Sequence, residues 1–147
     1  MARGKATPVE PISIDMTKAV SMEPMPDNTQ VLCRCDVLDV RGSKASGAKT
    51  AHVELTVVKP DAPGIINRKL FDDINLENEF TLGRLLNLLK GFGLTEDEIR
   101  KDNFVLVPED IIGLECTVVV GIRKSDRYGD RNSIKRVAPA EAYEAAA

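Results

Sequence analysis

Alternation of apolar and polar side chains along three stretches of the chain constrains the fold most. Apolar residues occupy every second position in the stretches 31–37, 51–57 and 114–122. A period of two residues is that of a half-buried β-strand, because successive side chains point to opposite faces. After Val37 the phase slips to Leu38 and Val40, as a bulge or bend in one long strand requires. We therefore expect strand hairpins and a bent first strand that can serve two sheets.

The remaining elements are predicted from shorter signals. A third, shorter strand is expected over 65–73, after a turn-rich segment at 60–64, and a last strand over 132–137 pairs back on 114–122. A second, short helix is expected from Thr95 to Arg100, where Thr95 and Glu98 have the spacing of a capping box. A longer helix, capped by Thr81 and ended by Gly91 or Gly93, is predicted by leucines at helical spacing: Leu82, Leu85, Leu86 and Leu89.

About five strands with a helical insertion after the third match an OB-fold, a five-stranded Greek-key barrel. The chain has 147 residues, a length that supports one hydrophobic core. We assign the barrel to residues 29–139. Residues 1–28 contain four of the eight prolines and form an N-terminal arm, and 140–147 form a short tail, with the chain frayed from Ala138.

Little in the sequence favours an enzyme, a metal site or a membrane protein. With a single histidine, His52, the chain has no multi-histidine zinc site, and we expect no Ser-His-Asp triad. Asp72 and Asp73 are adjacent in a strand, so they point to opposite faces and cannot share a metal ion. We expect no catalytic residue and no cofactor. Three cysteines, no signal-peptide pattern and no run of ~18 apolar residues favour the cytoplasm.

The net charge of −3 conceals a strong division of charge along the chain. Residues 41–69 carry six basic and two acidic side chains (+4), and residues 121–136 also carry six and two (+4). Between them, residues 70–120 carry four basic and eleven acidic side chains (−7). In an OB-fold the two basic blocks contain the loops that flank the oligonucleotide groove.

A single strand of nucleic acid presents phosphates and free base faces, so its site needs basic side chains and planar groups for stacking. Phe71 and Tyr128 are the best-placed aromatic residues, although Phe71 suits the core equally well and Tyr128 suits an exposed loop. We predict that these residues bind nucleic acid: Arg41, Lys44, Lys49, His52, Arg68, Lys69, Phe71, Arg123, Lys124, Arg127, Tyr128, Arg131, Lys135 and Arg136.

Three stretches together resemble a known family. They are 64–76 (GIINRKLFDDINL), 81–89 (TLGRLLNLL) and 112–120 (IGLECTVVV), the last followed by YGDRNSI at 128–134. In order and spacing they resemble the small OB-fold single-stranded-DNA-binding proteins of tailed bacteriophages, over roughly residues 30–139. The resemblance implies non-catalytic coating of single-stranded DNA during phage replication or recombination, in the cytoplasm of a bacterial host. It also implies replication or recombination proteins as partners.

One alternative remains open at this point. Because a fold does not dictate its ligand, the domain could instead be a protein-protein adaptor that uses its acidic 70–120 surface or its N-terminal arm. Self-association into a homo-oligomer is also left open by the sequence.

Overall fold

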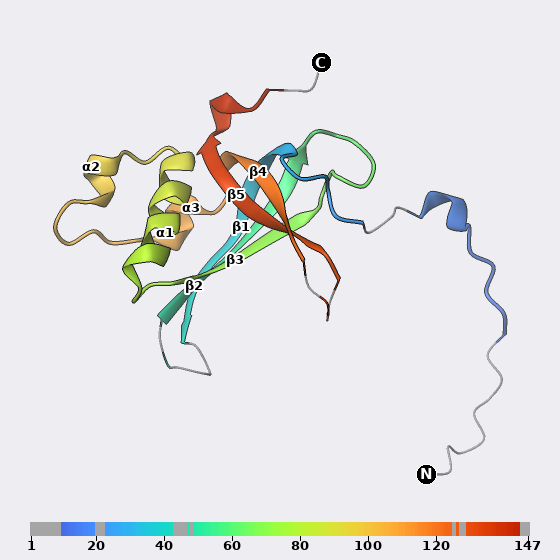
Figure 1. The fold of residues 1–147 in the computed structure, drawn as a ribbon, viewed down its shortest axis with the longest axis horizontal. Coiled ribbons are helices and arrows are strands. Elements are labelled where there is room, and N and C mark those ends of the chain that lie inside the picture. Colours follow the sequence, from blue (N-terminus) through green and yellow to red (C-terminus); the bar gives the residue numbers. More distant parts are fainter. Residues whose placement is uncertain are drawn as a thin grey trace, which may run out of the picture.

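The computed structural model describes residues 10–19, 23–42, 47, 49–124, 126 and 129–144. Within them the fold is mainly β, as the alternation predicts (Figure 1). One antiparallel sheet has the order β3-β2-β1-β4-β5 and leaves β3 and β5 as its edges. These edges are not hydrogen-bonded to each other among the described residues, although their Cα atoms come within 8 Å. The strands are β1 (Gln30–Gly42), β2 (Lys49–Lys59), β3 (Lys69–Asn75), β4 (Glu115–Arg123) and β5 (Arg131–Pro139).

The first strand bends where its apolar phase slips. The register of β1 on β2 shifts between Cys35 and Val37, so Asp36 is an extra residue in the ladder. On its other side β1 pairs with β4 only over Gln30 to Arg34, before the shift. The bulge was predicted correctly, and it allows β1 to pair with two strands that diverge from it.

The core lies between the inner face of this curved sheet and a helix. All three cysteines are buried in it as small apolar residues. Burial raises the pKa of Cys33 to about 12 and that of Cys35 to about 11, so neither thiol is reactive at neutral pH. The largest fully buried apolar side chains come from the strands, with Ile74 one residue beyond the predicted end of the third strand, and from α1: Val31, Val53, Leu55, Val57, Ile74, Val118, Val120 and Leu89.

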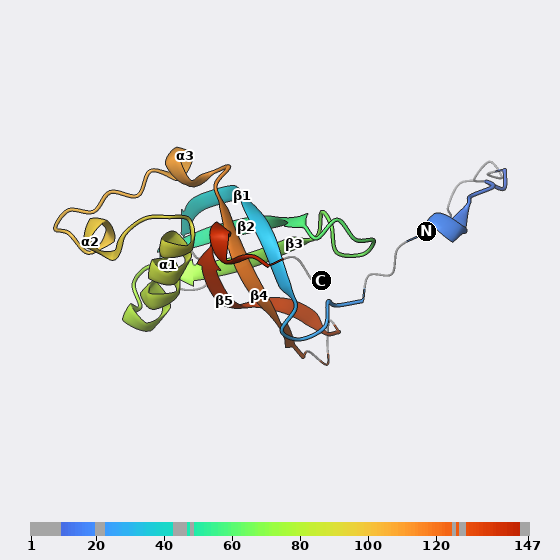
Figure 2. The same ribbon diagram turned by 90° about the horizontal axis from the view of Figure 1, so that it is seen from above.

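The helix α1 (Glu79–Gly91) packs near β3, β4 and β5 and covers one end of the sheet (Figures 1 and 2). The prediction that Thr81 caps it is wrong, because the helix begins earlier and Asn78 is the cap. The Asn78 side chain accepts hydrogen bonds from the backbone N–H groups of Phe80 and Thr81. Thr81 instead donates its hydroxyl to the carbonyl of Asn75, at 2.5 Å. The predicted end at Gly91 is confirmed.

Smaller elements follow or flank this framework. The helix α2 (Glu96–Ile99) is capped by Thr95, whose hydroxyl accepts from the N–H of Glu98, as predicted. The helix α3 (Pro108–Ile111) was not predicted. Two 3₁₀ turns, η1 (Met16–Lys18) and η2 (Ala140–Ala142), lie near the two ends of the chain. In the part of the chain that the structure describes, no helix is long and apolar enough to cross a membrane.

The third strand begins later than its apolar residues suggest. Ile65 and Ile66 were expected in the strand, but their N–H groups both donate to the carbonyl of Ala62 in a tight turn. Asn67 then adopts a positive φ of 66°, which turns the chain into β3. The turn that begins at 60–64 therefore includes Ile65 and Ile66. The apolar pattern of the sequence alone could not show that these two residues precede the strand.

The segment just before β1 and the C-terminal end of the described chain pack more closely on the sheet than expected. Met25 is buried in the core, and the N–H of Asn28 donates to the carbonyl of Val120. The prediction that the chain frays from Ala138 is wrong for residues 138–144. The Thr117 hydroxyl donates to the carbonyl of Pro139 (2.9 Å), and the N–H of Glu144 donates to the side chain of Gln30 (3.0 Å).

Candidate functional site

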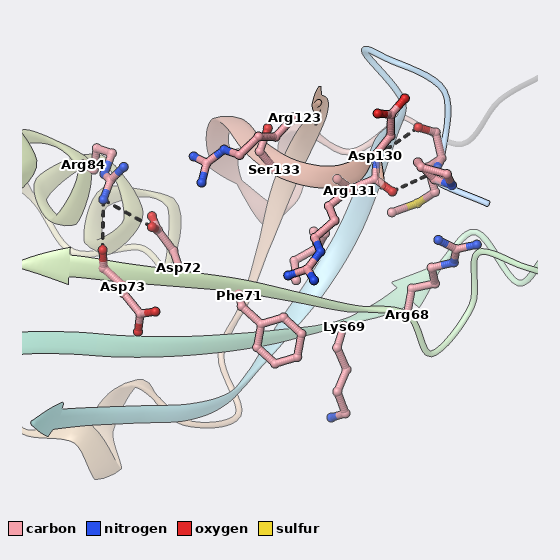
Figure 3. A pocket seen from close by; sticks show the side chains of 14 residues that line it. Arg68, Lys69, Phe71, Asp72, Asp73, Arg84, Arg123, Asp130, Arg131 and Ser133 are labelled. Carbon is pink, nitrogen blue, oxygen red and sulfur yellow. Dashed lines mark hydrogen bonds and ion pairs between the residues drawn. The ribbon is translucent and has the colours of Figure 1, made fainter. Parts of the chain in front are cut away.

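A cleft of about 590 Å³ lies between the edge strand β3 and the first residues of β5 (Figure 3). Its floor includes the buried residues Met25 and Leu70. We call it the basic cleft, because its lining includes five cationic residues against three acidic ones: Arg68, Lys69, Arg84, Arg123 and Arg131, against Asp72, Asp73 and Asp130. It lies between the two edge strands, β3 and β5, which would have to pair for the sheet to close into a barrel.

Asn132, on β5, fixes the wall of the cleft that lies opposite β3. Its amide nitrogen donates to the carbonyl of Met25 (2.9 Å), and its amide oxygen accepts from the N–H of Met25 (2.7 Å). The same nitrogen also donates to the carbonyl of Gly121 (3.2 Å). This pair of hydrogen bonds to the backbone of Met25 attaches the segment that precedes β1 to the β4–β5 hairpin. Asn132 had no role in the sequence prediction, because its partner is distant in the sequence.

Arg123 and Arg131 are the cations that β4 and β5 contribute to the cleft. They are directly opposite each other in the β4–β5 ladder, and both are exposed. Like charges at opposed positions destabilise a strand pair. An anion bound between them would relieve that repulsion, so the pair favours a phosphate or another anionic group.

Arg68, at the entrance of β3, is tied to the backbone of neighbouring segments. Its Nε donates to the carbonyl of Gly64 (2.6 Å), and one terminal nitrogen donates to the carbonyl of Glu23. These bonds hold the 60–68 turn against the segment that precedes β1. The guanidinium is thereby held at the rim of the cleft (Figure 3).

Asp72 and Arg84 form the other end of the cleft. An Arg84 terminal nitrogen lies 3.3 Å from Asp72 Oδ1 and donates to the carbonyl of Asp73 at 3.1 Å. Burial raises the pKa of Asp72 above its ordinary value, and the nearby cations Arg84 and Arg123 oppose this rise. Arg84 lies within the 81–89 stretch but was not predicted as a site residue, because a helical arginine is usually a solvated surface group.

On the outer face of the sheet, Phe71 forms an exposed aromatic platform with His52. Figure 3 shows Phe71 and Lys69 leaving β3 on the side opposite Asp72. The Phe71 side chain is 55% exposed, so it is not a core residue. Its ring centroid lies 6.3 Å from that of His52, with 26° between the planes. His52 is oriented by two carboxylates, Asp73 (2.6 Å) and Glu54 (3.4 Å). A planar ligand could stack on Phe71.

Beside this platform, Lys69 belongs to a small polar network around the bulge residue Asp36. Lys69 Nζ lies 3.3 Å from the Thr56 hydroxyl and 3.6 Å from Asp36. Asp36 also accepts from Arg34 (2.8 Å) and from the Thr56 hydroxyl. These hydrogen bonds lower the pKa of Asp36 to about 2, so Asp36 stays anionic and holds the Lys69 ammonium on the outer face of the sheet, near Phe71.

No protein-family model matches this chain, and no curated protein does.

The remaining predicted residues are spread over other parts of the sheet. Arg41 and Lys49 flank the tip of the β1–β2 hairpin, and Arg41 pairs with Asp39 at 2.9 Å. The register of β2 on β3 places Lys69 beside Thr56, seven residues from Lys49 or ~23 Å along a strand. The hairpin tip is therefore far from the Lys69 end of the basic cleft, whereas the other end of the cleft, at Asp73, lies opposite His52, three residues from Lys49.

On β5, Lys135 contacts the segment that precedes β1, where its Nζ lies 2.7 Å from Asn28 Oδ1 and 3.7 Å from Asp27. Arg136 lines a smaller cavity of about 80 Å³ with Asp72 and Arg84, and Lys124 is exposed after β4. Three predicted residues lie outside the described residues, so nothing here bears on them: Lys44, Arg127 and Tyr128.

The described part of the chain holds no group of three or more His, Cys, Asp or Glu side chains that could bind a metal ion. Asp72 and Asp73 do point to opposite sides of β3, Asp72 toward Arg84 and Asp73 toward His52 (Figure 3). What the arrangement offers chemically is attraction for an anionic ligand and a flat surface for an aromatic one.

Proposed function

We propose that the protein binds single-stranded DNA in and beside the basic cleft, without catalysis and with little sequence preference. The observation that carries this proposal is the position of Phe71. It is an exposed aromatic ring on the outer face of β3, and β3 forms one wall of a cleft whose lining includes five cationic residues. A single strand needs both groups close together, since its phosphates alternate with bases that can stack.

The same arrangement disfavours duplex DNA as the ligand. The bases of a duplex are stacked on each other and are not available to Phe71, so only the phosphates could be contacted. Phosphate contacts alone would give weaker, shape-independent binding.

We further propose that the sheet is an OB-fold whose closing strands are β3 and β5. The strand order, the bent β1 and the helix between β3 and β4 support this topology. The resemblance to phage single-stranded-DNA-binding proteins then suggests a role in DNA replication or recombination in the bacterial cytoplasm.

Titration of fluorescein-labelled oligo(dT) of increasing length, with a duplex of equal length in parallel, tests the proposal. We expect affinity that rises with length up to a limit and exceeds the duplex affinity by about tenfold or more. If four phosphates contact cations, log K should fall with log salt with a slope of about −3. No binding at low salt, or equal binding to the duplex, would contradict the proposal.

A further inference from the structure

The strand β1 has an open edge beyond Cys35. On the side away from β2, β1 pairs with β4 only as far as Arg34, and the N–H and C=O groups of Cys35 then bond to residues 113–114. Among the described residues, no backbone hydrogen bond joins 37–42 to any segment other than β2. Residues 39–42 are exposed, and Figure 1 shows the adjoining ends of β1 and β2 projecting from the rest of the sheet. An edge of this kind is a template for a further strand.

The charges on this edge are arranged symmetrically about an apolar residue. A charged edge resists pairing when like charges would face each other across the new ladder. Here Asp39, Val40 and Arg41 are consecutive, so an acidic and a basic side chain flank a valine that is 45% exposed. Asp39 and Arg41 lie on the same face of the strand, with 2.9 Å between the carboxylate and the guanidinium, and both are more than half exposed. The triplet is therefore complementary in charge to itself when it is reversed.

The geometry of an antiparallel ladder restricts how two copies of this edge can pair. Backbone groups of alternate residues point to the same edge, so the two-fold axis of such a pair passes through a residue and not between two residues. An axis at Asp39 or at Arg41 places two like charges opposite each other. An axis at Val40 places Asp39 opposite the partner's Arg41 twice, and places the two valines opposite each other. Charge therefore favours the register centred on Val40.

Charges outside the triplet favour the same arrangement. The C-terminal end of α3 lies beside Cys35, because the N–H of Gly113 donates to the Cys35 carbonyl at 2.8 Å. In a pairing centred on Val40, the hairpin tip of one copy runs toward the Cys35 end of the edge on the other copy, and so toward its α3. Residues 41–49 carry three basic and no acidic side chains, whereas residues 108–115 carry three acidic and no basic ones. The two segments attract each other across the contact.

We propose that two copies of the protein associate through this edge, by antiparallel pairing of residues 38–42 about a two-fold axis at Val40. The contact is isologous, so it closes at a dimer. It joins the sheets of the two copies and covers the exposed valine side chains. Because the shared ladder is short, the dimer should dissociate on dilution. The proposal concerns the protein without DNA, so it does not depend on the proposed function.

Sedimentation velocity of the full chain without DNA, from about 5 to 500 µM, is the primary measurement. We expect the mass of the wild type to rise with concentration and to level off at twice the monomer mass. Asp39→Arg puts a positive charge at both flanking positions, so it should remain monomeric, and Arg41→Asp should remain monomeric for the converse reason. Asp102→Arg is the matched control, because it makes the same change in charge at an exposed residue after α2, and dimerisation should persist.

A mixing experiment tests the register itself. An equimolar mixture of Asp39→Arg with Arg41→Asp should form a heterodimer, because two positive positions of one variant face two negative positions of the other. The double variant Asp39→Arg with Arg41→Asp exchanges the two charges and should dimerise by itself as the wild type does. Both residues are exposed, so all these variants should fold.

Four results would each overturn the proposal. They are a wild type that stays monomeric throughout or grows beyond a dimer, single variants that dimerise as the wild type does, a mixture that stays monomeric, and a charge-exchanged double variant that stays monomeric.

Discussion

At the scale of single residues, Phe71 is the side chain whose environment distinguishes a binding surface from a core. Its neighbours in β3 alternate as the pleat requires, with Leu70 and Ile74 buried and Phe71 and Asp73 exposed. A single exposed apolar side chain is common on protein surfaces and does not by itself indicate a binding site. Phe71 differs because its ring stacks on His52 and lies beside a cationic cleft.

The contribution of Phe71 can be measured by substitution. Phe71→Ala should weaken oligo(dT) binding by ~1–3 kcal/mol, the usual value of one base stacked on an aromatic ring. Phe80→Ala is the matched control, because Phe80 is an exposed phenylalanine in the first turn of α1 and is absent from the cleft lining. Equal affinities for wild type and Phe71→Ala in a fluorescence titration would remove the platform from the site.

Asp36 makes stability depend on pH in a defined direction. Its pKa is lowered from 3.8 to about 2 in the folded protein, so its stabilising effect is complete above pH 4 and is lost as pH falls toward 2. Asp36→Asn should therefore reduce the free energy of unfolding by about 1 kcal/mol at pH 7, a value discounted for solvent screening.

Urea denaturation at pH 7 and at pH 2 measures this difference, and the effect of Asp36→Asn should be smaller at pH 2. Asp39→Asn is the control, since its ion pair with Arg41 is more exposed than the Asp36–Arg34 pair. A destabilisation by Asp36→Asn that is equal at both pH values would show that its charge is not responsible.

At the scale of elements, the close packing of α1 on β5 can be seen at one glycine. A Cβ atom at Gly91 would collide with Cγ1 of Val137 and would lie 3.4 Å from the carbonyl oxygen of Ala138. Val137 is β-branched and has little rotamer freedom to move aside. At Gly83, in the same helix, a Cβ atom would point into open space, with no contact within 4 Å among the described residues.

The two glycines should therefore respond oppositely to alanine. Gly83→Ala should raise the free energy of unfolding by ~0.5–1 kcal/mol, because alanine loses less backbone entropy in a helix. Gly91→Ala should lower it by ~1–3 kcal/mol through overpacking. Thermal or urea unfolding of both variants measures the difference. Stabilisation by both substitutions would mean that α1 is farther from β5 than described.

Local patterns predicted the elements that depend on local interactions. The alternation over 51–57 and 114–122 predicted β2 and β4, and the leucine spacing predicted α1. The errors arose where a contact with a residue distant in the sequence determines the local structure. Asn132 binds Met25, 107 residues away, and no sequence period marks such a contact. Similarly, the tail is held by Gln30 and Thr117, which local propensity cannot reveal.

The candidate site was predictable in part for the same reason. Arg68, Lys69, Phe71, Arg123 and Arg131 were all predicted, and the fold brings them to one cleft because β3 and β5 are the two edges of a curved sheet. Arg84 was missed because its role depends on the contact between α1 and the Asp72 carboxylate of β3, which a helical arginine does not reveal in the sequence. Arg41 and Lys49 were grouped with these residues by net charge, but the strand register places them at the tip of the β1–β2 hairpin, ~23 Å along β2 from Lys69.

At the scale of the whole molecule, basic and acidic surfaces belong to different structural parts. The basic cleft lies between the edge strands, whereas residues 94–110, around α2 and α3, carry a net charge of −4. A field divided in this way attracts a polyanion to one side of the protein and repels it from the other. The net charge of −3 is therefore compatible with DNA binding.

The central claim is that single-stranded DNA binds in the basic cleft, and the salt dependence of site-directed variants tests it most directly. The cleft variant is Arg123→Ala with Arg131→Ala. The control is Lys90→Ala with Lys101→Ala, which removes the same net charge from exposed residues outside the cleft lining. Oligo(dT) affinity is measured for both, and for the wild type, from about 50 to 300 mM salt.

We predict that the slope of log K against log salt becomes shallower by about 1.4 in the cleft variant, because two phosphate contacts are lost, and is unchanged in the control. Equal slopes for the wild type and the cleft variant, or equal changes in the two variants, would contradict the claim that this cleft holds the DNA.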